Sequence, residues 1–306
     1  MGNMHTRPSH LDYASMITTV RESLPTLPLV MEDLSEKLKD PNASTHSVQE
    51  MMTSDPSLTM KILRIANSVQ FRGARDRVTD VGEAIATLGF DKIQMAIITT
   101  SVFKVYDLKD SEIRFDPKEL WKHSLGAAVA SSTIAEITAS CIPQRAYTCG
   151  LIHDIGKIAR LKLDADSFCD DVGQALYDEV PLHETEASAG SPLHDRLGHF
   201  VCKEWGMSRE VDSVIRWHHE PELSERNEVG TEDLHRLIDI VSLGNWLAHS
   251  MQFGFSGHRS HGKPPEQILE RLGLNSERLP ELKNATRSSF KDFNTFIKVL
   301  ERIERS

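Results

Sequence analysis

Residues 151–160, with the sequence LIHDIGKIAR, place polar side chains inside an otherwise apolar helical pattern. Leu151, Ile155 and Ile158 follow an i, i+4, i+7 spacing, which predicts a helix with one buried stripe. The polar members of this run are His153, Asp154 and Lys157. A buried carboxylate is unfavourable unless it is paired or binds a metal ion. The chain must therefore fold so that a partner or an ion meets this carboxylate.

Two interpretations of His153-Asp154 follow from the residues alone. In the first, the imidazole and the carboxylate bind a borderline metal ion, for which both are common ligands. Neighbours on a helix point about 100° apart, so both serve one site only if it is broad, such as a pair of ions about 3.5–4 Å apart. In the second, the segment is a capped core helix with a hydrogen-bonded histidine. The dipeptide alone leaves both open.

The rest of the chain repeats helical patterns, which predicts an all-α fold. Residues 97–100 are rich in isoleucine and threonine, but no alternation or hairpin turn accompanies them. We expect a loose N-terminus over residues 1–14, an N-terminal helical part over residues 15–115, and a helical bundle over residues 116–306. Two short helices should close the chain. The apolar helix over residues 91–105 has nowhere else to bury its surface, so the parts should form one folding unit.

Local signals refine this pattern. Asp55 can cap a helix and Pro56 suits its first position. Residues 24–28, LPTLP, should form a rigid entry, because each proline discourages helix just before it. Residues 120–139 predict a long helix rich in alanine and serine, whose small side chains allow close packing against neighbouring helices.

The composition excludes several classes of protein. The formal net charge of −10 argues against non-specific binding to nucleic acid or to an anionic membrane. No apolar run is long enough to span a bilayer, and the N-terminus lacks the layout of a signal peptide. Gly2 and Thr6 fit a loose myristoylation pattern, which we discount. The cysteines show no CxxC spacing and are typical of buried thiols in a reducing cytoplasm: Cys141, Cys149, Cys169 and Cys202.

Histidines recur on successive predicted helices. The series runs through His123, His153-Asp154, His194 and the pair His218-His219. Its nitrogen and oxygen ligands, without thiolate, suit Fe, Mn, Ni or Zn. Other histidines offer no clear partner or lie in predicted loops, and we expect them to lie outside a site: His5, His10, His46, His183, His199, His235, His249, His258 and His261.

Together these motifs resemble the HD superfamily of metal-dependent phosphohydrolases. More narrowly, the chain is similar to HDOD domains, the HD-related output domains of bacterial signalling, over roughly residues 20 to 250. The stretches that carry the resemblance are DPSLTMKILRIANS (55–68), AIATLG (84–89), LWKHS (120–124) and GLIHD (150–154), followed by His194, Gly198, Trp205 and His218-His219. Each motif is weak alone, and the ordered set is specific.

A related group, the cyclic-di-GMP phosphodiesterases of HD-GYP type, carries HDIGK and HHE, and this chain has both, at residues 153–157 and 218–220. In that group a Gly-Tyr-Pro motif follows HHE closely, whereas here the sequence continues as PELS over residues 221–224. That group also leaves the N-terminal helices unexplained. HDOD is the better match.

The chain departs from the superfamily at the last ligand, which is normally an aspartate in a late apolar helix. The matching piece is LGNWLA, with Asn245 in place of the aspartate. Its carbonyl oxygen brings no negative charge, which weakens affinity for a divalent ion. Asp239 lies six positions earlier and would face another direction on a helix. The resemblance thus implies one or two divalent ions held by His123, His153, Asp154, His194, His218, His219 and Asn245.

Three functions are weighed. The first is a non-enzymatic signalling module with a protein partner, since HDOD domains generally resemble degenerate HD enzymes. The second is an active phosphohydrolase on a nucleotide or cyclic dinucleotide, in which Asp154 orients a metal-bound water and Lys157 contacts phosphate as a point charge. A solvated helix residue is the plain alternative for Lys157. The third, a nucleic-acid-binding regulator, conflicts with the acidic charge.

Overall fold

The computed structural model describes residues 11–20, 56–72, 77–106, 108 and 114–304, and this part of the chain contains helices and no strand. The all-α prediction is therefore confirmed. The helices are α1 (Tyr13–Val20), α4 (Pro56–Ala66), α5 (Val69–Arg72), α6 (Val81–Leu88), α7 (Phe90–Tyr106), α8 (Pro117–Thr138), α9 (Pro143–Ile152), α10 (Ile155–Leu163), α11 (Ala165–Asp178), α12 (Leu182–Ala189), α13 (His194–Glu204), α14 (Arg209–Trp217), α15 (Glu232–Ser250), α16 (Glu266–Arg271), the 3₁₀ turn η1 (Ser276–Arg278) and α17 (Leu279–Glu304).

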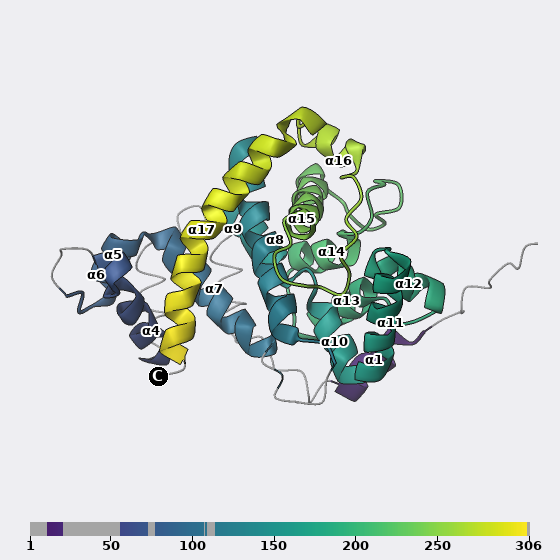
Figure 1. Ribbon diagram of the computed structural model, residues 1–306, viewed down its shortest axis with the longest axis horizontal. Coiled ribbons are helices and arrows are strands. Elements are labelled where there is room, and N and C mark those ends of the chain that lie inside the picture. The colour runs from purple at the N-terminus through teal and green to yellow at the C-terminus, as the bar shows by residue number, and fades with distance from the viewer. Residues whose placement is uncertain (1–10, 21–55, 73–76, 107, 109–113, 305–306) are drawn as a thin grey trace, which may run out of the picture.

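The long helix α8 lies at the centre of the molecule, between α9 and α15 (Figure 1). Helices α10, α13 and α14 lie on one side of this centre, and α4, α5 and α6 lie at the opposite end. Helix α17 runs from α16 across α8 to α4 and so connects the two ends. The site residues of the sequence analysis all lie on the side of α10, α13 and α14 or on the central helices.

Helix α8 packs closely against its neighbours because its middle turns, residues 126–133, are rich in small side chains, as predicted. Asp116 caps its first turn by accepting a hydrogen bond from the Lys118 amide, and Pro117 is its first residue. A Cβ atom on Gly150 of α9 would lie 2.9 Å from Ala128 Cα, and one on Gly244 of α15 would collide with the Ser131 hydroxyl. Glycine at both crossings lets α9 and α15 approach the α8 backbone.

The buried core is continuous from end to end of the described chain. One cluster of apolar side chains joins Ile62 of α4 and Ile93 of α7 to Ile158 of α10 and Ile240 of α15. This continuity favours the predicted single folding unit, which stays a prediction together with the division near residue 115. No helix of the described residues is both long and apolar enough to cross a bilayer.

The N-terminal helix α1 packs against α10 and α13. Tyr13 is buried within the span expected to be loose, and its ring stacks on Phe200 at 5.9 Å between centroids. The backbone amide of Leu193 donates a hydrogen bond to the Tyr13 hydroxyl oxygen at 3.1 Å. Because Leu193 is the residue just before α13, this contact stabilises the start of a helix that carries His194.

One expectation is wrong: the chain was predicted to close with two short helices, but α17 has 26 residues. Residues 182–189 form α12, a helix that was not predicted. The predicted features at Gly2, Thr6, residues 24–28 and Asp55 lie outside the described residues.

Candidate metal centre

The apolar spacing predicted one continuous helix through His153 and Asp154. In the structure the helix is broken at these two residues. Helix α9 ends at Ile152, α10 begins at Ile155, and the dipeptide forms the turn between them. Asp154 has φ −98° and ψ 13°, outside the helical region. Both side chains reach one site, because His153 Nε2 lies 3.4 Å from Asp154 Oδ2.

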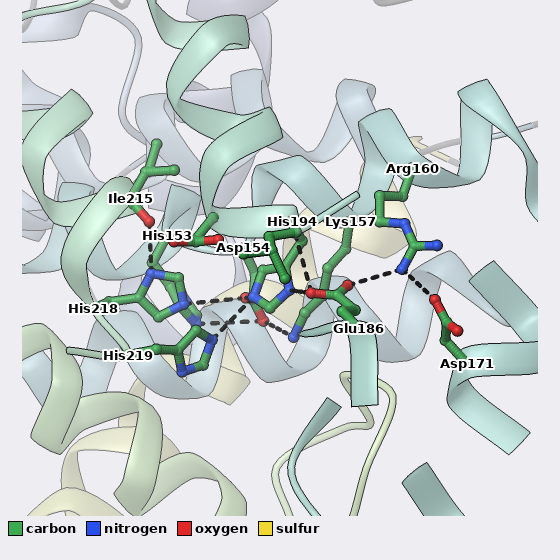
Figure 2. A network of polar contacts seen from close by, with 12 residues as sticks. His153, Asp154, Lys157, Arg160, Asp171, Glu186, His194, Ile215, His218 and His219 are labelled. Atoms are coloured by element: carbon green, nitrogen blue, oxygen red, sulfur yellow. Dashed lines mark hydrogen bonds and ion pairs between the residues drawn. The ribbon is translucent and has the colours of Figure 1, made fainter. Parts of the chain in front are cut away.

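The Asp154 carboxylate is fully buried at the centre of the histidine series (Figure 2). On one side, its Oδ2 lies 3.4 Å from His153 Nε2 and 3.9 Å from His123 Nε2. On the other side, its Oδ1 lies 3.4 Å from His194 Nε2 and 3.6 Å from His218 Nε2. Each carboxylate oxygen thus faces a separate pair of imidazoles.

These residues form two groups whose ligand atoms lie within 4.8 Å of one another and which share Asp154. The first group, called here the α8 subsite, is His123, His153 and Asp154; the second, the α13 subsite, is Asp154, His194, His218 and His219. His219 Nε2 is 3.0 Å from His194 Nε2. All predicted histidine ligands and the aspartate are therefore brought together.

The donor set fits a metal ion because several buried atoms have no other partner. His153 Nδ1 donates to the Gly150 carbonyl at 2.7 Å, and His218 Nδ1 donates to the Ile215 carbonyl at 2.8 Å. Their Nε2 lone pairs then face the site. In the described structure His153 Nε2, His218 Nε2 and Asp154 Oδ1 are buried without a hydrogen-bond partner. Buried polar atoms are rarely left unpaired, and a metal ion bound here would satisfy all three.

Helices α10 and α13 cross at two glycines, which brings His194 to Asp154. A Cβ atom on Gly156 would collide with the His194 carbonyl oxygen. One on Gly198 would lie 2.7 Å from Ile215 Cγ2 and 3.2 Å from the Gly156 amide. Only glycine at both positions allows this crossing, which explains the glycine in the HDIGK motif in physical terms.

His194 has a carboxylate partner that the sequence did not reveal. Glu186 of α12 is fully buried, and its Oε2 lies 2.6 Å from His194 Nδ1. The other oxygen of Glu186 accepts from Arg160 Nη1 at 3.0 Å, and Arg160 also donates to Asp171 at 2.7 Å (Figure 2). Glu184, two residues before Glu186 in the same short helix, is exposed. Residue type alone therefore does not distinguish the buried Glu186 from the exposed Glu184.

Lys157 is fully buried, so the solvated interpretation of this residue is wrong. Its Nζ donates to Asp154 Oδ2 at 2.7 Å. Burial by itself would raise the pKa of Asp154, but the His153 imidazole and the Lys157 ammonium hold that pKa well below its usual value. The carboxylate is therefore ionised and ready to bind a cation.

Asn245 lies on α15 beside His123, at the edge of the α8 subsite. Its Oδ1 accepts a hydrogen bond from His123 Nε2 at 2.9 Å. Asp239 lies elsewhere, as expected from its position on the helix: it accepts from Arg226 Nη2 at 2.6 Å and from Arg271 Nε at 2.7 Å. Asp239 is therefore a structural carboxylate that fixes α16 and the loop after α14 to α15.

Four of the clustered imidazoles are held neutral by burial: His123, His194, His218 and His219. Burial is the largest cause that lowers the pKa of His123, to about 3, and it also lowers the pKa of His194, His218 and His219. The charge of Lys157 adds to the shift at His194. Neutral imidazole is the form that binds metal ions.

Three histidines that were expected to lie outside the site extend the cluster. The ring of His183 stacks on His219, with centroids 4.0 Å apart. The ring of His249 lies 4.3 Å from His123, and His258 lies 4.0 Å from His249. Only the fold reveals these neighbours, because His258 arrives from the loop after α15.

The HDOD domain family model matches residues 24–221, which is more than half of the chain. The chain belongs to the HDOD family. This membership confirms the resemblance found in the motifs. A comparison with curated proteins finds no match for this HDOD chain.

Solved structures share the fold. An HDOD domain protein of unknown function from Geobacter sulfurreducens has a TM-score of 0.71 and 21% identity, over 95% of this chain and 98% of that chain. A protein from Marinobacter aquaeolei VT8, named as a candidate signal transduction protein, has a TM-score of 0.71 and 18% identity, over 94% of this chain and 61% of that chain. A protein from Shewanella amazonensis SB2B, named as a candidate phosphohydrolase, has a TM-score of 0.62 and 18% identity, over 94% of this chain and 98% of that chain.

Proposed function

We propose that this HDOD protein is a signalling module that binds one or two divalent transition-metal ions (Fe, Mn, Ni or Zn) and has lost most or all hydrolytic activity. The observation that carries the proposal is the contact between Asn245 and His123, because a neutral amide takes the place where the superfamily has a charged ligand. The seven ligand positions are those named from the sequence, with Asn245 at the edge of the α8 subsite.

The charge balance supports the loss of activity. Asp154 is the only carboxylate in the two subsites, and the Lys157 ammonium already neutralises it. Two divalent ions would add four positive charges beside a single ligand carboxylate that Lys157 already pairs, and the nearby Glu186 is likewise paired with Arg160. Buried charge of one sign is strongly unfavourable. The site therefore suits one ion better than two, and hydrolysis in which two metals clamp the attacking and leaving oxygens needs both.

A signalling role with a protein partner is supported by family membership and by the name of the Marinobacter structure. The helices α4 to α6 extend away from the metal-binding side (Figure 1). We place the partner on this N-terminal portion, so that the bundle and its metal serve as the framework. A cytoplasmic location stays a prediction.

The alternative function is phosphohydrolysis of a nucleotide or cyclic dinucleotide. Its specific support is the buried Lys157 ammonium beside Asp154, a group that can contact a phosphoryl oxygen. A bound metal ion would supply a nucleophile by lowering the pKa of a coordinated water. In that case Asp154 would orient the water and Lys157 would bind the phosphate.

Metal analysis of the purified protein, paired with a screen of nucleotides and cyclic dinucleotides, tests the proposal. We expect bound transition metal and no turnover above background. Asp154→Ala should lose the metal while circular dichroism shows an unchanged helical fold. Metal-dependent turnover by the parent protein would instead establish the alternative, and unchanged metal content in Asp154→Ala would exclude Asp154 as a ligand.

A further inference from the structure

A chain of charged side chains leads from outside the metal centre to one of its ligands. It begins at Asp171 on α11, passes through Arg160 on α10 and Glu186 on α12, and ends at His194 on α13 (Figure 2). All four side chains are at most 9% exposed. Buried ion pairs are weak sources of stability, so four helices converging on one imidazole call for a further explanation.

Glu186 fixes both the orientation and the tautomer of His194. Its Oε2 accepts from the His194 backbone amide at 3.1 Å and from His194 Nδ1 at 2.6 Å. With the proton on Nδ1, the Nε2 lone pair faces the α13 subsite, 3.4 Å from Asp154 Oδ1. A carboxylate in this position also raises the basicity of a ligating imidazole.

Arg160 in turn fixes Glu186. Its Nη1 bridges Glu186 Oε1 at 3.0 Å and Asp171 Oδ2 at 2.7 Å. The guanidinium lies over the ring of Phe168, 5.3 Å from the centroid. Each oxygen of Glu186 therefore has a separate role: Oε1 is held by the arginine, and Oε2 is left to His194.

The α8 subsite is prepared differently. His123 Nε2, the nitrogen that faces Asp154, already donates its proton to Asn245 Oδ1 at 2.9 Å. A metal ion there would have to displace this hydrogen bond and change the tautomer of His123. At the α13 subsite, the Nδ1 protons of His194 and His218 are engaged by Glu186 and by the Ile215 carbonyl. His218 Nε2 has no partner, and His194 Nε2 accepts a hydrogen bond from His219 Nε2 at 3.0 Å. An ion here would replace that contact with His219 but would leave the tautomers of His194 and His218 unchanged.

We propose that the α13 subsite holds the primary metal ion, and that Glu186 is the positioning residue that prepares His194 for it. The inference rests on the proposed metal-binding function and adds which half of the centre binds first. The α8 subsite, limited by Asn245, is then the weaker one.

Titration of metal-free protein with Co²⁺ tests this, because the visible absorption of Co²⁺ reports on its ligands and the affinity follows from the same titration. We expect one tightly bound ion per chain. His194→Ala should abolish the tight step, whereas His123→Ala should keep it within about threefold. Glu186→Gln should weaken it by about 10- to 100-fold, the usual effect of removing a carboxylate behind a ligating histidine, and should change the Co²⁺ spectrum.

Glu210→Gln is the matched control. Glu210 also forms an ion pair between helices, at 2.6 Å to Arg145, but it is not part of the centre. This variant should leave the affinity and the spectrum unchanged. If Glu186→Gln does not fold, Asp171→Asn loosens Arg160 without touching His194 and should weaken binding in the same direction by a smaller factor.

The outcomes separate the two proposals. If the parent protein binds no Co²⁺, the metal-binding function fails. If the parent binds it but His123→Ala removes the tight ion while His194→Ala retains it, only the assignment of the primary subsite fails. If the tight ion depends on His194 and is unaffected by Glu186→Gln or Asp171→Asn, Glu186 has a purely structural role.

Discussion

Gly156 of α10 faces the backbone carbonyl of His194 on α13, and the two main chains lie so close that no side-chain carbon fits between them. This contact sets the distance between the turn that carries Asp154 and the helix that carries His194. The two halves of the candidate metal centre are therefore positioned by a backbone crossing as well as by the contacts between the candidate ligands.

Gly156→Ala should separate α10 and α13, since its Cβ atom would overlap the His194 carbonyl oxygen. We expect a loss of about 3 kcal/mol in the free energy of unfolding, the upper part of the usual range for overpacking, together with weaker metal binding. Denaturant unfolding and Co²⁺ titration measure the two effects. In Gly173→Ala, where the new Cβ atom meets nothing within 4 Å, helix propensity should instead stabilise the protein by up to about 1 kcal/mol. Equal effects of the two variants would contradict the role given to the crossing.

Asn245→Asp should strengthen the α8 subsite, because it adds an anionic oxygen of nearly the same shape beside His123. We expect a second ion to bind where the parent holds one, and weak hydrolysis of phosphodiesters where the parent shows none. Metal titration beside a turnover assay measures both. A variant that binds no more metal than the parent would show that Asn245 does not occupy the ligand position.

Lys157→Met should make the protein depend on metal for its stability. Without metal, Asp154 loses the ammonium at 2.7 Å, and breaking a buried pair costs about 3–5 kcal/mol. An added ion restores a positive partner, so the rise in melting temperature on metal addition should exceed that of the parent. Lys162→Met, at an exposed position on the same helix, should leave this rise unchanged. An equal rise in all three proteins would mean that Lys157 does not compensate the charge of Asp154.

The metal-free protein should lose stability as the pH falls below about 6.5. Burial lowers the pKa of His123 and His183 to about 3 in the folded state. Between about 3 and 6.5 the unfolded chain therefore binds more protons, and each such histidine removes up to about 1.4 kcal/mol per pH unit of acidification. Above pH 6.5 these histidines are neutral in both the folded and the unfolded chain, so they cause no loss of stability.

Glu186 acts in the opposite direction, because burial raises its pKa and protonation then favours the folded state. Protonation of Glu186 offsets the stability lost through the histidines only near and above its unfolded-state pKa of about 4.3. Thermal melts in chelator from pH 5 to pH 8 measure the net effect. A melting temperature that stays constant between pH 7 and pH 5 would contradict neutral buried imidazoles.

The candidate ligand series could be predicted because imidazole and carboxylate are common metal ligands and because their order along the chain resembles that of the HD superfamily. His123, Asp154 and His218 stand out in helical stretches that are otherwise apolar or amphipathic. The break between α9 and α10 could not be predicted, since the apolar spacing of Leu151, Ile155 and Ile158 continues through it. Local periodicity describes one face of a helix and does not register a two-residue turn that preserves that face.

The positioning residues were hidden for another reason. Glu186 acquires its role from Arg160 and His194, which belong to other helices, and nothing in its own short segment separates it from the exposed Glu184. The contacts that decide this role are tertiary, and a local pattern cannot contain them. The length of α17, in contrast, is present in the sequence, because Phe290, Phe293, Ile297 and Leu300 follow a helical spacing.

The hydrogen bond from Leu193 to Tyr13 has a consequence for the order of folding. Its partners are 180 residues apart in the chain. During synthesis Tyr13 therefore leaves the ribosome long before Leu193 exists, and its ring has no Phe200 to stack on until α13 has emerged. Closing so long a loop is only about 0.6 kcal/mol less favourable than closing one of half the length. The large separation therefore affects when the contact forms more than how stable it is. The start of α13, and with it His194, is braced only after the earliest part of the chain has come back to meet it.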